Sequence, residues 1–194
     1  GDEDLIPDEQ VVVTMTSANY IKRSPIAEYK KQGRGGKGRR GMSTREEDVI
    51  EHVVNASTHD YLLFFTNKGR VFRIKTYEIP ATSLSAKGVA IVNLLQLQPE
   101  EMISAVINVS KQSEGGNLLM CTVKGVVKKT PFEQYKNVRA SGLIAINLDE
   151  GDELKWIRMT DGSREVIIST EQGQAIRFHE KDAIRPTRKS GQVF

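Results

Sequence analysis

The stretch YLLFFTNKGRVFRI, residues 61–74, joins two apolar runs through a short polar turn that contains Gly69. Aromatic and β-branched residues on both sides of a glycine-containing turn are typical of a β-hairpin. The same pattern occurs in three other stretches, VVVTMTSANYIKRS (11–24), NLLMCTVKGVVKKT (117–130) and EVIISTEQGQAIRF (165–178). The chain is therefore built from repeats, and each repeat is predicted to begin with a hairpin.

Each repeated stretch carries the same marker residues. The first apolar run ends in a threonine, and the four threonines lie 50, 56 and 48 residues apart at Thr16, Thr66, Thr122 and Thr170. Three residues later come Asn19, Gly69, Gly125 and Gly173. Seven residues after each threonine comes a basic residue, namely Arg23, Arg73, Lys129 or Arg177. Because asparagine and glycine tolerate a positive φ, the third position is predicted to be the turn of each hairpin.

A second glycine marks the later part of each unit, at Gly38, Gly88, Gly142 and Gly191. An apolar run follows it, as in GVAIVNLLQL (88–97) and GLIAINLDE (142–150), and then an acidic bend and a further apolar run. Each unit is thus predicted to hold four strands, with boundaries near 11–57, 58–110, 111–160 and 161–194. The one helix candidate, SPIAEYKK (24–31), is predicted to span one or two turns.

Four strands in each unit of about 50 residues are typical of propeller-like blades. The sequence therefore predicts an all-β fold in one domain, 1–194, of about four four-stranded blades. The chain stops three residues after Gly191, inside a unit. We therefore expect the last blade to be incomplete and the blades to form an open arc with exposed edges.

Positive charge is concentrated early in the chain. The stretch KKQGRGGKGRRG, residues 30–41, holds six basic residues and five glycines, whereas the net charge of the whole chain is only +3. Between residues 20 and 45 there are nine basic residues and one acid, Glu28. A local excess of this size indicates an anionic partner, and a solvated charged face is the alternative.

On the repeat, this basic stretch is the connection between the second and third strands of the first unit. The same connection in the later units also carries basic residues, namely Lys87, Arg139, Arg185, Arg188 and Lys189. A curved row of basic side chains suits a polyphosphate backbone. For Arg73 and Arg177 an ion pair between blades is the open alternative. For the pairs Lys22–Arg23 and Lys128–Lys129 we expect exposure and phosphate contact.

Other classes of function have little support in the sequence. No aromatic residue lies in the basic stretch to stack on an unpaired base, which favours duplex DNA held by its backbone. GRGGKG (33–38) satisfies a dinucleotide-binding spacing but lacks the strand before it and the helix after it. His52, His59 and His179 are scattered, so no metal and no cofactor are predicted.

The single cysteine, Cys121, lies in an apolar run and is predicted to be a small buried residue. A lone cysteine favours a reducing compartment, the cytoplasm. No apolar run is long enough to cross a membrane.

The repeats and the basic stretch together resemble the C-terminal domain of the A subunit of bacterial DNA gyrase. Residues 11–38 are similar to its first blade, and residues 32–38 match six of the seven positions of the family's signature Q-(R/K)-R-G-G-(R/K)-G, Gly33 being the departure. THDYLLFFTNKGRVF and YEIP look like its second blade, and IRPTRKSG like part of its fourth. The resemblance covers essentially the whole chain. Residues 32–38 are called the basic box below.

The resemblance implies a β-pinwheel, a propeller-like domain whose blades exchange strands. It implies a domain that wraps duplex DNA and presents a crossover to the topoisomerase core for ATP-driven negative supercoiling, without catalysing the reaction itself. The implied partners are duplex DNA, the gyrase B subunit and the remainder of the gyrase A subunit. The resemblance implies no membrane partner. Two alternatives remain, a propeller-type protein-interaction module and the corresponding domain of the topoisomerase IV A subunit.

The repeat positions, the connections and the basic box together define the predicted DNA-binding residues. They are Lys22, Arg23, Gln32, Gly33, Arg34, Gly35, Gly36, Lys37, Gly38, Arg39, Arg40, Lys68, Arg70, Arg73, Lys75, Lys87, Lys128, Lys129, Arg139, Arg177, Arg185, Arg188 and Lys189.

Overall fold

A computed structural model describes the backbone of residues 1–34, 48–110, 116–160, 165–169, 175–179 and 192–193. Side chains are described in 1–31, 48–110 and 116–160. The chain divides into two compact units, one of Gly1–Leu63, Arg73–Pro99 and Val106–Lys111, the other of Phe64–Phe72, Glu100–Ala105 and Gln112–Phe194.

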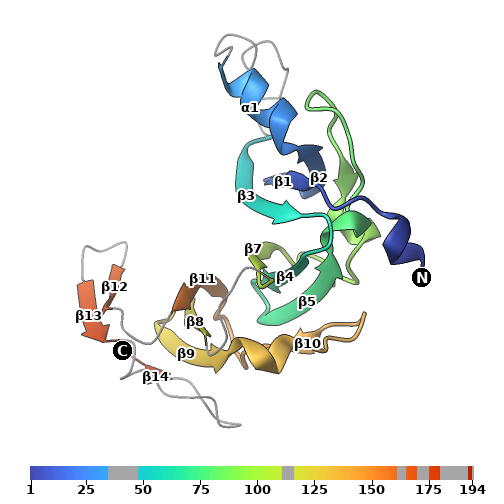
Figure 1. Cartoon of the computed structure of the whole chain (residues 1–194). Helices are drawn as coiled ribbons and strands as arrows, with labels where there is room; N and C mark the ends of the chain where they lie inside the picture. Colours follow the sequence, from blue (N-terminus) through green and yellow to red (C-terminus); the bar gives the residue numbers. More distant parts are fainter. Residues whose placement is uncertain (35–47, 111–115, 161–164, 170–174, 180–191, 194) are drawn as a thin grey trace. The chain divides into compact units, whose positions relative to one another are not determined.

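Short strands are the main regular elements of the described chain (Figure 1). The first half contains η1 (Asp2–Leu5), β1 (Gln10–Thr16), β2 (Tyr20–Pro25), α1 (Ile26–Arg34), β3 (Ile50–Ser57), β4 (Tyr61–Thr66), β5 (Arg70–Lys75), η2 (Thr76–Glu78), β6 (Val89–Ala90) and η3 (Ile91–Asn93). The second half contains β7 (Ile103–Asn108), β8 (Asn117–Thr122), β9 (Val126–Pro131), η4 (Phe132–Tyr135), β10 (Leu143–Ile144), β11 (Leu154–Thr160), β12 (Glu165–Ser169), β13 (Ala175–His179) and β14 (Gln192–Val193).

The strands form three four-stranded sheets and one two-stranded sheet in the described part of the chain. Their orders are β3-β1-β2-β6, β10-β5-β4-β7, β11-β8-β9-β14 and β12-β13. The four predicted hairpins are β1–β2, β4–β5, β8–β9 and β12–β13. The all-β class is therefore confirmed.

The hairpin turns have the predicted chemistry. In the first three hairpins the marker residue has a positive φ, which is 65° at Asn19, 77° at Gly69 and 88° at Gly125. The amide of that residue donates to the carbonyl oxygen of the preceding marker threonine at 3.0 Å in all three cases. The hydroxyl of the same threonine accepts from the amide four residues on, at 3.3, 3.2 and 3.0 Å for Tyr20, Arg70 and Val126. Threonine thus recurs because its side chain closes the turn.

The strand after the second marker glycine differs from the prediction in length and in partner. It is only two residues long, and it pairs with the hairpin of the preceding unit, as in Tyr20↔Ala90 and Ile21↔Val89. β10 and β14 join the preceding hairpins in the same way, at β5 and β9. The exchange of strands that the family resemblance implied is therefore present, since each of the three four-stranded sheets takes one strand from the next unit.

The shortness of the exchanged strand follows from its hydrogen bonds. The amide of Ile91 donates to the carbonyl oxygen of Asn19 in the hairpin turn at 2.8 Å, and the chain then enters η3. Ile91 is fully buried at that point. Because the pairing ends where the hairpin ends, only two residues reach the strand edge. In the second sheet the amide of Ala145 makes the equivalent bond to Gly69 at 2.7 Å.

Each unit has its own apolar core. In the first unit the fully or almost fully buried side chains include Val13, Met15, Ile21, Leu62 and Ile79. In the second unit they include Phe64, Phe65, Phe72, Met120 and Ile146, and the rings of Phe65 and Tyr135 pack edge to face. In β1, β4 and β8 most consecutive residues are buried, so side chains on both faces of these strands are covered.

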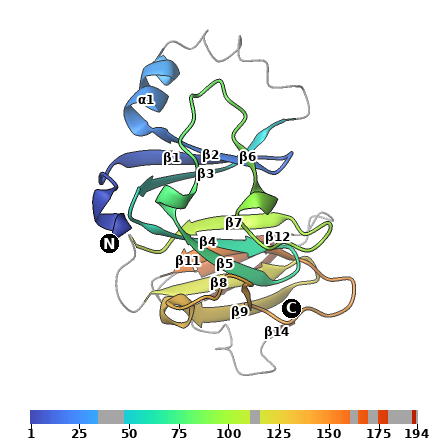
Figure 2. The same cartoon turned by 90° about the vertical axis from the view of Figure 1, so that its right-hand side faces the viewer.

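The helix α1 follows β2 directly and lies beside β1 and β2 (Figures 1 and 2). It spans nine residues, so it extends three residues beyond the predicted segment and includes the backbone of Gln32, Gly33 and Arg34. Pro25 precedes it, and Lys30 and Lys31 lie in its C-terminal half, where positive charge interacts favourably with the helix dipole.

Candidate nucleic-acid interface

Lys22 is the first of the predicted contact residues along the chain, and its ammonium group is already engaged. It donates to the carbonyl oxygens of Leu84 at 2.6 Å and Ala86 at 2.8 Å, with Ser83 at 3.5 Å. Burial lowers the pKa of this ammonium group. Lys22 therefore holds residues 83–86, the connection that leads into the exchanged strand β6, onto β2.

Arg23 also binds the chain that follows the second hairpin. Its Nε donates to the carbonyl oxygen of Ile79 at 2.6 Å, and its backbone exchanges hydrogen bonds with Pro80 and Thr82 at 3.2 Å each. The predicted exposure of Lys22 and Arg23 is therefore wrong, because both are half-buried and bind carbonyl groups from more than fifty residues away.

The corresponding pair in the third hairpin is engaged as well. The Lys128 ammonium group donates to the carbonyl oxygen of Ala145 at 2.7 Å, and burial lowers its pKa. Lys129 is 7% exposed. The predicted exposure of this pair is wrong for a related reason, since the backbone that follows β10 binds Lys128 and Lys129 is buried.

Arg70 makes a similar connection in the second sheet. One guanidinium nitrogen pairs with the carboxylate of Glu101 at 2.8 Å, and another donates to the carbonyl oxygen of Ser141 at 2.6 Å. The Glu101 side chain is fully buried and also accepts from the Thr66 hydroxyl at 2.7 Å. A buried carboxylate that accepts from both a charged and a neutral donor fixes the arginine in place.

Arg73 and Lys75, on β5, meet at one aromatic ring. The Arg73 guanidinium carbon lies 3.3 Å from the centre of the Tyr61 ring, and the Lys75 ammonium nitrogen lies 4.0 Å from it. The expected alternative for Arg73 was an ion pair between blades. Arg73 instead makes a cation–π contact with the neighbouring strand, and its Nε atom is buried with no hydrogen-bond partner among the described residues.

Three predicted residues are exposed. They are Lys68 in the turn between β4 and β5, Lys87 before β6 and Arg139 before β10. Lys87 lies 4.1 Å from the centre of the Tyr20 ring, which keeps its charge beside the connection that Lys22 holds. The exposed lysines Lys30 and Lys31 on α1 were missing from the predicted set, although they belong to the same basic stretch.

The remaining predicted residues cannot be placed at side-chain level. Gln32, Gly33 and Arg34 lie on α1 and Arg177 lies on β13, where only the backbone is described. Outside the described residues lie Gly35, Gly36, Lys37, Gly38, Arg39, Arg40, Arg185, Arg188 and Lys189.

Other kinds of site have no support where the structure is described. In that part of the chain no three histidine, cysteine or acidic side chains lie together as metal ligands. Burial raises the pKa of the Cys121 thiol to about 11, so this cysteine is an unreactive core residue, as predicted. The helices of the described segments are all too short or too polar to cross a bilayer.

The chain is similar to proteins of one kind. The family described as "DNA gyrase C-terminal domain, beta-propeller" matches residues 10–57, 60–110, 116–161 and 164–192, which correspond to the four repeats. The DNA gyrase A subunit of Halalkalibacterium halodurans is 50% identical over 93% of the chain, and that of Clostridium acetobutylicum is 52% identical over 95%. The chain spans only 22% of the length of each of these relatives.

A solved structure supports the same comparison. The crystal structure of the C-terminal domain of DNA topoisomerase IV aligns with 97% of this chain and 57% of its own, at 28% identity and a TM-score of 0.81.

Proposed function

Because the chain belongs to the DNA gyrase C-terminal domain, beta-propeller family, we propose that it binds duplex DNA and wraps it against its basic residues. The observation that carries the proposal is the concentration of positive charge at the end of α1. The exposed Lys30 and Lys31 on this helix lead directly into the basic box, in a stretch with six basic residues among twelve.

The contacts in this proposal are to phosphates rather than to bases. Lys68, Lys87 and Arg139 are exposed cations on turns and connections, where a DNA backbone can reach them. The Tyr20 ring beside Lys87 is already covered by the ammonium group of that lysine. Sequence preference would then arise from the ease of bending the duplex.

In a gyrase, the wrapped DNA would be presented as a crossover to the B subunit and to the remainder of the A subunit. The crossover would serve negative supercoiling in the cytoplasm. This chain would supply binding and curvature and no catalytic group. The corresponding role in a topoisomerase IV A subunit is the second candidate, favoured by the similarity to the solved topoisomerase IV domain.

The test is relaxation of closed circular DNA by a type I topoisomerase with this chain bound. If the DNA wraps with a positive hand, the topoisomers that remain after removal of the protein are shifted toward a positive linking difference. The shift increases in proportion to the amount of chain added. Binding without any shift would contradict wrapping. Failure to bind a duplex at low salt would contradict the whole proposal and favour a protein-interaction module.

A further inference from the structure

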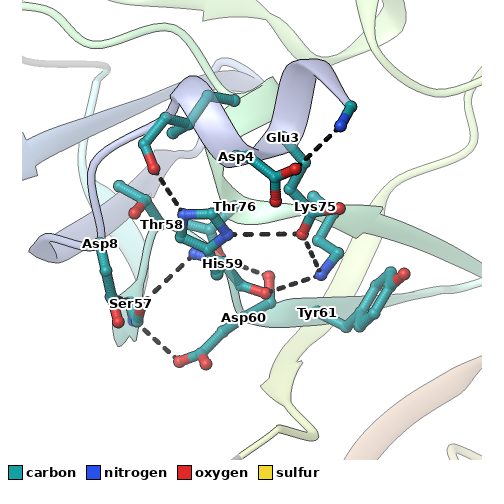
Figure 3. Close-up of polar contacts among 12 residues, drawn as sticks. Glu3, Asp4, Asp8, Ser57, Thr58, His59, Asp60, Tyr61, Lys75 and Thr76 are labelled. Atoms are coloured by element: carbon teal, nitrogen blue, oxygen red, sulfur yellow. Dashed lines mark hydrogen bonds and ion pairs between the residues drawn. The ribbon is translucent and has the colours of Figure 1, made fainter.

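The N-terminal segment, residues 2–9, lies against the start of the second hairpin through polar contacts (Figure 3). The amide of Thr58 donates to the carbonyl oxygen of Glu9 at 2.9 Å, and the Thr58 hydroxyl donates to that of Pro7 at 2.6 Å. None of the η1 residues is buried, and Leu5 is 82% exposed. Apolar burial therefore contributes little to this docking, and its strength depends on charge and hydrogen bonds.

Glu3 is the charged anchor of the segment. Its carboxylate lies 2.9 Å from the Lys75 ammonium nitrogen and 3.4 Å from Nδ1 of His59. The other ring nitrogen of His59 donates to the carbonyl oxygen of Ile6 at 2.7 Å. Figure 3 shows the Glu3 carboxylate between the His59 ring and the end of the Lys75 side chain.

Two cationic side chains of β5 lie against one aromatic ring, and one of them, Lys75, is the partner of Glu3. Lys75 and Arg73 both lie over Tyr61, at 4.0 and 3.3 Å from its centre, and His59 adds a third nitrogen group. The Lys75 side chain is 16% exposed, whereas Glu3 is 45% exposed. The carboxylate therefore sits at the surface, and the lysine beneath it is closed to other anions while the segment is docked.

A phosphodiester oxygen can replace this carboxylate. Both are anionic acceptors of hydrogen bonds from an ammonium group. An ion pair at the surface is weak and is screened by salt, whereas a duplex brings several phosphates at once. A DNA backbone that reaches β5 can therefore displace Glu3 at little cost.

We propose that His59, Tyr61, Arg73 and Lys75 form a phosphate-binding site, and that Glu3 occupies it as an internal competitor of DNA. The inference rests on the proposed DNA binding and deepens it. Lys75 contacts a phosphate only after the N-terminal segment has released it. The free energy needed to open the segment therefore lowers the net affinity for DNA.

Charge-neutral variants provide a direct test. We expect Glu3→Gln to raise the affinity of the 194-residue chain for a short duplex by about 2- to 4-fold. Asp2→Asn is the matched control, because it removes the same charge from the same segment but not from the pair with Lys75. The gain should disappear in the Glu3→Gln/Lys75→Gln double variant compared with Lys75→Gln alone.

Equal gains from Glu3→Gln and Asp2→Asn would show a general charge effect and overturn the inference. A gain from Glu3→Gln that persists without Lys75 would also overturn it. If neither the wild type nor any variant bound the duplex, the proposed function would fail, and the site would fail with it.

Hydrogen exchange gives an independent measurement. Saturating duplex should speed amide exchange in residues 2–9 while it slows exchange at other DNA contacts, because the segment is released as the phosphate binds. Unchanged or slower exchange in residues 2–9 would overturn the competition.

Discussion

The ammonium group of Lys22 donates to the carbonyl oxygen of Leu84 at 2.6 Å, across 62 residues of sequence. Lys22 belongs to the first hairpin and Leu84 to the connection that leads into the exchanged strand. The bond therefore joins two repeats, and it places Lys22 in the framework of the blade. The exposed Lys87 follows three residues after Leu84, so the same bond also positions a candidate phosphate contact.

Loss of this bond should loosen the exchanged strand. We expect Lys22→Met to lower the free energy of unfolding by about 1–2 kcal/mol, because three carbonyl groups lose a charged donor. Urea unfolding checks the value, and faster exchange of the Ile91 amide, which is bonded to Asn19, locates the effect. Lys87→Met, at an exposed position, should stay within about 0.5 kcal/mol of wild type. Equal losses of unfolding free energy in the two variants would contradict this structural role of Lys22.

Exposed and engaged basic residues should differ in their effect on salt dependence. Lys87→Gln and Arg139→Gln should each reduce the slope of log affinity against log salt by about 0.9, the value for one phosphate contact. Lys128→Gln removes the same charge, but its ammonium group is bonded to Ala145, so we expect an unchanged slope. Titrations of one duplex at several salt concentrations provide the measurement. The reverse ranking would mean that the engaged lysines reach the DNA.

A methyl group at Gly69 should be more costly than one at Gly151. Both have φ of 77°, so alanine incurs about 1–2 kcal/mol of backbone strain at either position. A Cβ at Gly69 would also lie 2.5 Å from the carbonyl oxygen of Ile146, whereas at Gly151 the nearest atom is the Lys124 ammonium nitrogen at 3.6 Å. We expect Gly69→Ala to cost about 1–3 kcal/mol more than Gly151→Ala. Matching thermal midpoints would rule out close contact between the turn and the exchanged segment.

Docking of the N-terminal segment should depend on pH. The hydrogen bond to the Ile6 carbonyl is the main cause that raises the pKa of His59 above its usual 6.5, with Glu3 and Asp8 adding to it and burial opposing it. Lys75 and then His59 lower the pKa of Glu3. A raised histidine pKa stabilises docking below 6.5, and this contribution is lost as pH rises through the folded-state value. A lowered carboxyl pKa stabilises docking above the usual value for Glu3 and is lost in acid.

Docking should therefore be strongest between the two pKa values. Amide exchange in residues 2–9, corrected for its intrinsic pH dependence, should show more protection at about pH 6 than at about pH 8. The other groups that face the His59 ring are Tyr77, whose ring centre lies 6.1 Å away, and Lys75, which donates to the His59 carbonyl oxygen. His59→Gln should remove the difference between the two pH values. A variant that retains it would assign the titration to another group.

The hairpins could be predicted because their determinants are local. Each hairpin depends on two apolar runs, a marker threonine and an asparagine or glycine three residues later, all in one short stretch of the chain. The hydrogen bonds from Asn19 to Thr16 and from Gly69 to Thr66 use only those residues. The sequence alone therefore determined the number of hairpins, their register and the all-β class. It also located the basic stretch, since charge density is a property of composition.

Tertiary structure decided which sheet each two-residue strand joins and which basic residues are engaged. β6 completes the sheet of β2 because the edge of β2 offers unpaired backbone groups that no residue of the first hairpin can satisfy. Lys22 is enclosed by carbonyl groups of residues 83–86, whereas Lys87, in the same connection, is exposed. The two lysines are chemically identical in the sequence. Only the distant chain that folds back onto β2 distinguishes them, because a carbonyl oxygen acts as an acceptor for Lys22 once the fold brings it within hydrogen-bonding distance.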